Sequence, residues 1–401
     1  MNNVGLSGAA SRSSSSPAVL IAVASIVIFI YGMLASMLGT IVPSLGVRLS
    51  ITNKEISWLA LAQGIGLAAT SVWAGALMER RGKKIGVVLG LCASVIGLLI
   101  LTHPGSLLLS IVAMAILGIG GSLVIVGANV IVNDVSDDRK AAALNFLNIF
   151  VGLGGMATPF VAGNLLQSDS IKVAWCGAGI AAIALMLTLA TPMRKPAPAE
   201  TAFRHASVFR HRTLYILALV TFLYTACEFG IWNWLPRFLI ASGVPGSTAL
   251  NILSLGFACG ILLGRLGAAK LLGKASPLVV TILAAMAMGI TTFAMLRTTT
   301  PAITGCIVFL AGISMAPIFP TTIAIIGKVF KQGAATAIGF AITCGFSGLV
   351  LSSPVIGWLS GPDPSGIGKG LLMIPILALV ITILLLAFRK DLAGDSRASE
   401  A

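Results

Sequence analysis

The stretch "LLLSIVAMAILGIGGSLVIVGANVI", residues 107–131, contains no charged side chain. An apolar run of about 18 or more residues is typical of a membrane-spanning helix, because a helix of about 20 residues crosses the hydrocarbon core of a bilayer. More runs of this kind occur along the whole chain. In order, the twelve runs are 18–42, 55–78, 84–102, 107–131, 141–166, 171–192, 213–240, 248–272, 277–296, 301–327, 333–359 and 366–388. The sequence therefore predicts an all-α integral membrane protein with twelve transmembrane helices.

The composition agrees with this prediction. Of the 401 residues, 57% are hydrophobic and 9% are charged, and the mean hydropathy is +1.03. A soluble domain usually contains about 25% charged residues. The runs are also too long for the strands of a membrane β-barrel, which need about ten alternating residues each.

The positive charges of the chain are unevenly placed. The net charge of +14 alone would fit a nucleic-acid partner, but 19 of the 26 Lys and Arg residues fall in the terminal tails or in the loops after even-numbered runs. Cytoplasmic loops of membrane proteins carry such an excess. We therefore expect a multi-pass protein of the cytoplasmic (inner) membrane with both termini in the cytoplasm. The protein is then expected to contact the lipid bilayer and not to bind nucleic acid.

The longest polar interruption divides the runs six and six. This stretch, residues 191–213, is rich in Pro, Arg and Lys, and it is either a plain cytoplasmic loop or a linker between two related bundles. A weak repeat favours the linker, because Pro159 and Pro354 each follow small residues and precede a glycine. The predicted organisation is a disordered cytoplasmic tail (1–17), an N-terminal six-helix bundle (18–192), a cytoplasmic linker (193–212), a C-terminal six-helix bundle (213–388) and a cytoplasmic tail (389–401).

Motifs for cofactors and metals are absent from the sequence. The six cysteines lie inside predicted helices without a C-x-x-C pair, which is typical of packing residues. The stretch "GLGGMA" follows no strand, so its likeness to a dinucleotide fingerprint carries little weight, and no phosphate-binding G-x-x-x-x-G-K-[ST] loop occurs. We predict no cofactor, no metal site, no catalytic residue and no enzymatic activity.

The most specific motif is "GALMERRGKK", between the second and third runs. It resembles the signature G-x-L-[AG]-[DE]-R-x-G-[RK]-[RK] of the major facilitator superfamily. The matching residues are Gly75, Leu77, Glu79, Arg80, Gly82, Lys83 and Lys84. Together with the twelve runs, the resemblance covers the whole chain, although the acid of the signature is usually aspartate. It implies two pseudo-symmetric six-helix bundles and a cytoplasmic gate whose charges latch the bundles together. The alternative is a solvated basic turn that only sets the topology.

A narrower resemblance appears in "YTACEFGIWNWLPRFL", residues 224–239. It is similar to the fucose-permease branch of sugar:proton symporters, in which an acid precedes a Trp by six residues, as Glu228 precedes Trp234 here. Asn129 and Asn145 match asparagines of that branch in its fourth and fifth helices. The fucose permease has further acids in its first and fourth helices, and this chain has none there. Proton coupling and fucose are therefore not implied.

Glu228 is the most informative single residue. A charge at the bilayer centre costs about 2.5–3.5 kcal/mol on insertion scales, and such residues usually face a cavity. Glu228 and Arg265 are the two charged side chains placed deep in the runs. Tyr224 and Trp232 share a helix face with Glu228, and this stripe suits hydroxyl groups and the apolar face of a sugar ring. The alternative is an aromatic packing stripe beside a structural Glu228–Arg265 pair.

Amides in the runs are further candidates for substrate binding. Without partners they are costly in lipid, so we expect them to face the central cavity; they are Gln63, Asn129, Asn145 and Asn148. Glu228 and Arg265 are also the proton-coupling candidates. Burial favours the neutral carboxyl group and the nearby cation favours the carboxylate, and the sequence leaves both states open.

These observations predict a secondary active transporter that works by alternating access. As a monomer, it would move a small polar solute such as a sugar or polyol, with a proton as candidate coupling ion. The alternative is a drug or metabolite efflux antiporter of the same superfamily. Efflux members often carry G-x-x-x-G-P-x-x-G-G, and "GGMATPFVAG" has Thr158 and Ala162 in place of two glycines. A nutrient receptor or a membrane enzyme has no supporting residues.

Overall fold

The computed structural model describes residues 15–135, 140–193, 206–271, 275–298, 300–330 and 333–393. Within these residues, twelve helices are long and apolar enough to cross a membrane. The number and order of the predicted helices are confirmed, and so is the all-α fold class. The predicted tail 1–17, the centre of the linker 193–212 and the end of the tail 389–401 fall largely outside the described residues.

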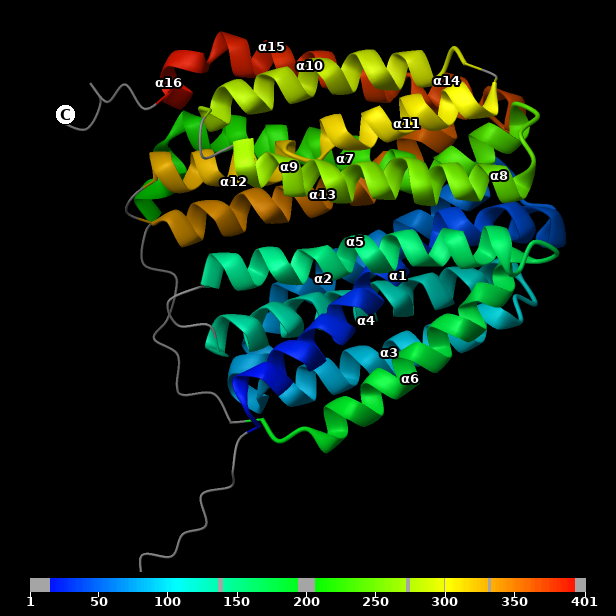
Figure 1. Cartoon of the computed structure of the whole chain (residues 1–401), viewed down its shortest axis with the longest axis horizontal. Helices are drawn as coiled ribbons and strands as arrows, with labels where there is room; N and C mark the ends of the chain where they lie inside the picture. Colours follow the sequence, from blue (N-terminus) through cyan, green and yellow to red (C-terminus); the bar gives the residue numbers. More distant parts are fainter. Residues whose placement is uncertain are drawn as a thin grey trace, which may run out of the picture.

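The first six spans form one half of the molecule, blue to green in Figure 1. They are α1 (Pro17–Leu49), α2 (Asn53–Arg81), α3 (Lys83–Thr102), α4 (Leu107–Val135), α5 (Lys140–Asn164), and α6 (Val173–Ala190), which follows the short helix η1 (Ser170–Lys172). We call this half the N-bundle.

The last six spans form the other half, which we call the C-bundle (Figure 1). Three of its spans are single helices, α7 (Arg212–Ala241), α10 (Pro277–Met295) and α13 (Ala334–Ser360). The other three are divided: α8 (Gly246–Asn251), η3 (Ile252–Ala258) and α9 (Cys259–Leu271) form one span, α11 (Pro301–Met315) and α12 (Ile318–Val329) form the next, and η4 (Pro364–Gly366), α14 (Ile367–Leu371) and α15 (Met373–Ala387) form the last. The short helices η2 (Ala206–Arg210) and α16 (Arg389–Ala393) precede and follow the six spans. Because the number of spans is even, α1 begins and α15 ends at the same end of the molecule. We call it the terminal end, and the opposite end the distal end.

The first helix is longer than the sequence predicts. The apolar run was expected to end at 42, before a proline, but α1 continues through Pro43 to Leu49. A proline inside a helix removes one backbone hydrogen bond, and membrane helices tolerate this loss. At the distal turn, Ser50 closes α1 with a left-handed φ of 51°. Thr52 and Glu55 then form a capping box that starts α2.

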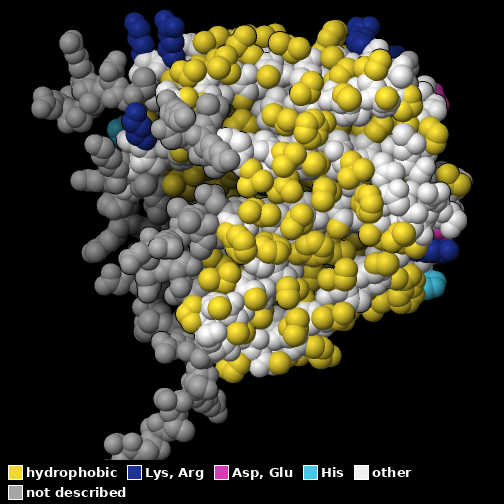
Figure 2. Space-filling view, viewed as in Figure 1, with side chains coloured by type: hydrophobic (Ala, Val, Ile, Leu, Met, Phe, Trp, Pro, Cys, Tyr) yellow, Lys and Arg dark blue, Asp and Glu magenta, His cyan; other side chains and the backbone are white. Residues whose placement is uncertain are grey.

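The lateral surface of the molecule is apolar. Figure 2 shows hydrophobic side chains over the middle of this face, with Lys and Arg gathered toward the two ends. Large exposed side chains include Val72, Ile290 and Trp358, which are 77%, 69% and 77% exposed. Such a surface would be unfavourable in water and is suited to the hydrocarbon core of a bilayer. The chain is therefore a multi-pass membrane protein.

The two bundles meet closely along their distal halves. A Cβ atom on Gly39 of α1 would collide with the backbone oxygen of Trp232 in α7, and one on Gly357 of α13 would lie 2.8 Å from Ser57 Cβ in α2. Asn164 of α5 and Asn251 of α8 exchange amide hydrogen bonds of 2.6 and 3.1 Å. Each of these contacts joins the N-bundle to the C-bundle beyond the middle of the spans, so the molecule is closed toward the distal end.

Candidate functional site

Glu228 lies near the middle of α7, and its side chain is 11% exposed. One of its carboxylate oxygens, Oε1, is 3.7 Å from Nη2 of Arg265 in α9. The indole N–H of Trp232, one helical turn further along α7, donates to the same oxygen at 3.5 Å. The structure thus brings together three of the residues that the sequence singled out.

Aromatic rings surround this ion pair. Trp232 stands edge-on to Phe257 of η3, with 5.2 Å between the ring centroids. The ring of Tyr224 lies 6.4 Å from that of Phe319 in α12. Phe257 belongs to a π-helical stretch, and such stretches are frequent at functional sites. The charged pair therefore lies in an aromatic setting built by α7, η3, α9 and α12.

The polar groups of this site are incompletely satisfied. An ion-pair hydrogen bond between nitrogen and a carboxylate oxygen is usually about 2.7–2.9 Å long, so the contact between Arg265 and Glu228 is loose. Among the described residues, the buried hydroxyl of Tyr224 makes no hydrogen bond of standard geometry, although Glu228 and Arg265 lie close to it. Buried polar groups of native proteins normally have partners. Glu228, Arg265 and Tyr224 thus retain hydrogen-bonding capacity that a bound solute can use.

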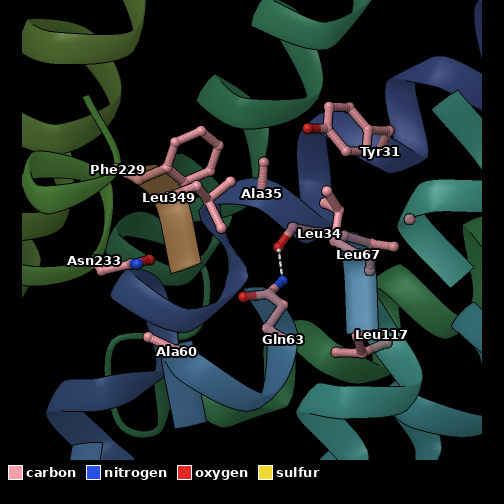
Figure 3. A pocket seen from close by; sticks show the side chains of 11 residues that line it. Tyr31, Leu34, Ala35, Ala60, Gln63, Leu67, Leu117, Phe229, Asn233 and Leu349 are labelled. Atoms are coloured by element: carbon pink, nitrogen blue, oxygen red, sulfur yellow. Dashed lines mark hydrogen bonds between the residues drawn. The ribbon is translucent and has the colours of Figure 1, made fainter. Parts of the chain in front are cut away.

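A small enclosed cavity lies between the bundles (Figure 3). Its volume is about 20 Å³, and its lining residues come from α1, α2 and α4 on one side and from α7 and α13 on the other; they are Tyr31, Leu34, Ala35, Ala60, Gln63, Leu67, Leu117, Gly121, Phe229, Asn233 and Leu349. Gln63 donates to the backbone oxygen of Leu34 at 2.9 Å. Asn233 donates to Ser353 Oγ at 3.0 Å. A space of this size holds about one water molecule, so in this conformation it is too small for a sugar.

The other predicted amides are placed differently. The side-chain amide of Asn129 donates to the backbone oxygen of Ile125 in its own helix at 2.8 Å. This bond satisfies one of the amide N–H groups within the helix itself. Asn148 is exposed, and the side chain of Asn145 lies outside the described residues. Of the three predicted amides whose side chains the structure describes, Gln63 is the one that lines the cavity between the bundles.

The motif 75–84 forms the turn between α2 and α3. Gly82 has a φ of 100°, a left-handed conformation that favours glycine. Glu79 and Arg80 are exposed and Lys83 is buried, while no contact would block a Cβ atom on Gly75. Within the described residues, Glu79 forms no ion pair. Lys84 donates to the backbone oxygens of Leu189 at 2.7 Å and Thr191 at 3.0 Å. It therefore caps the end of α6 within the N-bundle, a contact between residues more than 100 positions apart that no local sequence pattern shows.

The Lys84 contact predicts a measurable loss of stability. A cation at the carboxyl end of a helix satisfies free carbonyl groups and interacts favourably with the helix dipole. Replacing Lys84 with Met should lower the free energy of unfolding by about 1–2 kcal/mol. The matched control is Lys172→Met, because Lys172 is exposed at the opposite, amino end of α6. Thermal unfolding in detergent checks both variants, and equal melting temperatures for the two would contradict the capping role.

Some residues of the interface were missed at the sequence level. Asn233 was overlooked although it stands between two tryptophans in "IWNWLPR". Arg237 and Asn53 fall near predicted helix ends, where polar residues are ordinary, and nothing local in the sequence shows that they meet. Tyr31 of α1 was also missed, and it lines the cavity.

Comparisons with known proteins establish the family. Residues 24–353 match the family model of the Major Facilitator Superfamily. The chain belongs to the major facilitator superfamily. A curated relative, Major facilitator superfamily domain-containing protein 4B of Danio rerio, is 28% identical over 153 residues. That alignment covers 36% of this chain and 28% of the relative, so the chain matches less than a third of its length.

Solved transporters of this superfamily share the fold. A variant of the nucleoside transporter NupG superimposes with a TM-score of 0.79 at 16% identity, over 92% of this chain and 99% of that one. The D-xylose-proton symporter gives 0.78 at 13% identity, over 93% and 98%. FucP in its outward conformation gives 0.64 at 18% identity, over 92% and 98%. The chain thus shares the fold of these transporters, and it belongs to the superfamily that the motif 75–84 implied.

Proposed function

We propose that this protein is a secondary active transporter that binds a small, neutral, polyhydroxylated solute, a sugar, a polyol or a nucleoside, between its two bundles. The solute would contact Glu228, Tyr224 and Trp232, with Arg265 as an additional donor. A proton carried by Glu228 is the candidate coupling ion. Superfamily membership and structural neighbours that transport a nucleoside and a pentose support this substrate class.

One observation carries the proposal. Helices α7 and α9 hold a carboxylate, a guanidinium and a phenol whose hydrogen bonds are long or lack standard geometry, beside the indole of Trp232. A purely structural ion pair would be expected to have short contacts that repay its desolvation. Hydroxyl groups both donate and accept, so a polyol can satisfy all three polar groups at once. The apolar face of a sugar ring can also lie against the indole.

We further propose that the terminal end faces the cytoplasm. The excess of Lys and Arg in the loops of that end supports this orientation. The close contacts of Gly39, Gly357 and Asn164 with the other bundle lie toward the distal end, as an inward-facing conformation requires. The exposed Glu79, without an ion pair in the described part of the chain, fits a cytoplasmic latch that is released in this conformation.

A ligand screen on the purified protein tests the substrate class. A ligand that binds the folded state raises its melting temperature. We expect stabilisation by members of one group among pentoses, hexoses, polyols and nucleosides, and no stabilisation of the Glu228→Gln variant by the same compound. Stabilisation by lipophilic cations, with none by hydroxylated solutes, would instead support the drug-efflux function.

A further inference from the structure

Arg237 of α7 reaches across the distal interface between the bundles. Its Nε donates to Oδ1 of Asn53, the first residue of α2, at 2.9 Å. Its Nη2 donates to the backbone oxygen of Ile51 at 3.4 Å. Both acceptors belong to the N-bundle, whereas Arg237 belongs to the C-bundle. The contact is therefore made only when the distal ends of the bundles are together.

Asn53 of the N-bundle also donates hydrogen bonds to the C-bundle. Its side chain is fully buried, and its Nδ2 donates to the backbone oxygens of Gly361 at 3.1 Å and Asp363 at 2.9 Å. Both carbonyl groups follow α13 in the C-bundle. One amide thus accepts from α7 and donates to the end of α13, so it joins α2 to two elements of the other bundle.

The turn between α1 and α2 is shaped to receive the guanidinium group. The capping box of Thr52 and Glu55 fixes the first turn of α2, which carries Asn53. A Cβ atom on Gly46 of α1 would lie 2.6 Å from Nη1 of Arg237, so the absence of a side chain there makes room for the cation. The guanidinium group also lies beside the carboxyl end of α1, which favours a positive charge.

The partners of Arg237 are suited to a contact that is broken and remade. Within the described residues, no carboxylate lies at ion-pair distance from Arg237, and its acceptors are an amide and a backbone carbonyl group. Hydrogen bonds to neutral acceptors can be exchanged for water at a smaller cost than a buried ion pair. When the distal end opens, the same groups become hydrated.

We propose that Arg237, Asn53 and the two positions that receive the guanidinium group, Gly46 and Ile51, form the distal gate of the transporter, which stabilises the conformation closed at that end. The gate rests on the proposed alternating-access mechanism. It does not depend on Glu228 or on the identity of the solute.

Distance measurements between spin labels test the gate without any substrate. Labels on cysteines at Leu165 of the N-bundle and Lys369 of the C-bundle, both exposed at the distal end, report its opening. The six native cysteines are replaced in this background. We expect Arg237→Gln and Asn53→Ala to raise the population with the long inter-label distance, relative to the population with the short one, on the order of tenfold.

Gly46→Ala provides a second variant that retains both polar side chains. Alanine favours the helix, so folding should be preserved while the new methyl group displaces the guanidinium. The population shifts of Gly46→Ala and Arg237→Gln should not add, because both act on one contact. Unchanged distances in the Arg237→Gln and Gly46→Ala variants would overturn the gate, even if the transporter still binds its solute.

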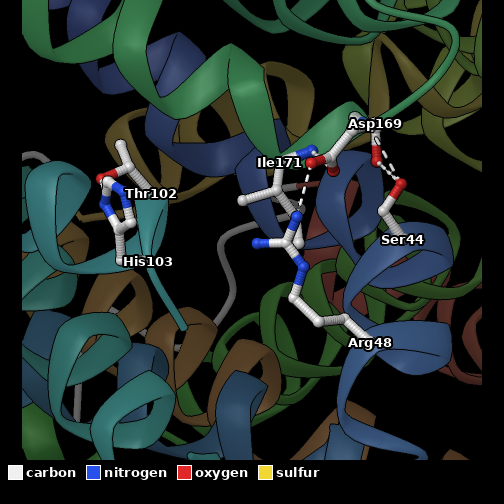
Figure 4. Close-up of polar contacts among 7 residues, drawn as sticks. Ser44, Arg48, Thr102, His103, Asp169 and Ile171 are labelled. Atoms are coloured by element: carbon white, nitrogen blue, oxygen red, sulfur yellow. Dashed lines mark hydrogen bonds and ion pairs between the residues drawn. The ribbon is translucent and has the colours of Figure 1, made fainter. Parts of the chain in front are cut away.

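Arg48→Gln is the matched control. Arg48 is also a distal arginine, but its Nη2 pairs at 2.6 Å with Oδ2 of Asp169 in the same bundle (Figure 4). Loss of that pair should leave the distance distribution unchanged. A shift as large as that of Arg237→Gln would show a general loosening of the distal end, and the gate would be rejected.

Discussion

Replacing Glu228 with glutamine is expected to reduce uphill uptake of the solute about 10- to 100-fold in a folded, membrane-inserted protein. The amide preserves the shape of the side chain and can still accept a hydrogen bond from Trp232. It cannot ionise, so it can neither pair with Arg265 as an anion nor carry a proton. Uptake into proteoliposomes with an imposed proton gradient measures the effect.

Two transport assays separate the roles that Glu228 can have. If Glu228 carries the proton alone, the variant should lose accumulation against a gradient but keep exchange of solute across the bilayer. If it binds the solute, both activities should fall. Normal accumulation by a well-expressed variant would rule out both roles.

A structural ion pair would give another pattern. Glu228→Gln would then leave the guanidinium group of Arg265 without a counter-charge, and the melting temperature would fall. The double variant with Arg265→Gln should recover part of that loss, because removing one partner of a buried pair costs more than replacing both. We expect little change in melting temperature for Glu228→Gln, because the existing contact of 3.7 Å is already loose.

The fold could be predicted from the sequence because its main signal is local. Each membrane span must be long, apolar and internally hydrogen-bonded, so every helix is visible in its own segment. The errors concern helix ends, as at Pro43, which the apolar pattern treats as a stop although α1 continues to Leu49. What lies beyond that proline depends on packing against the other bundle, which no single segment shows.

The candidate site was only partly predictable. A lone carboxylate in an apolar helix is conspicuous, and the spacing of Trp232 from Glu228 requires them to be neighbours on a helix. The contact between Arg237 and Asn53 joins residues 184 positions apart, near helix ends where polar side chains are common. The amide of Asn129 donates to its own helix, so the prediction that it binds substrate stays a prediction. Polar residues in membrane helices therefore identify a site only when their partners are known.

Replacing Gly39 with alanine is expected to reduce the transport rate at least about tenfold, because it obstructs closure of the distal end. A Cβ atom at this position would collide with the backbone oxygen of Trp232, and no rotamer change can relieve a contact with backbone. Overpacking of this kind costs about 1–3 kcal/mol, and here the cost falls on only one of the two conformations. The added methyl group would meet no such obstacle once α1 and α7 separate at the distal end, so the protein should still fold.

Two glycines of the N-bundle serve as controls for Gly39→Ala. A Cβ atom on Gly154 of α5 would collide with the backbone oxygen of Phe29 in α1, inside one bundle, so Gly154→Ala should lower the melting temperature itself. Gly179 of α6 has nothing within 4 Å of an added Cβ atom, so Gly179→Ala should change neither stability nor transport. Spin labels at the distal end should show that the Gly39→Ala variant mainly adopts the conformation with the long inter-label distance. Its melting temperature should stay near that of the unmodified protein. If Gly39→Ala instead transported at the normal rate, α1 and α7 would not need this close approach, and closure would have to rest on the polar contacts of Asn53 and Arg237.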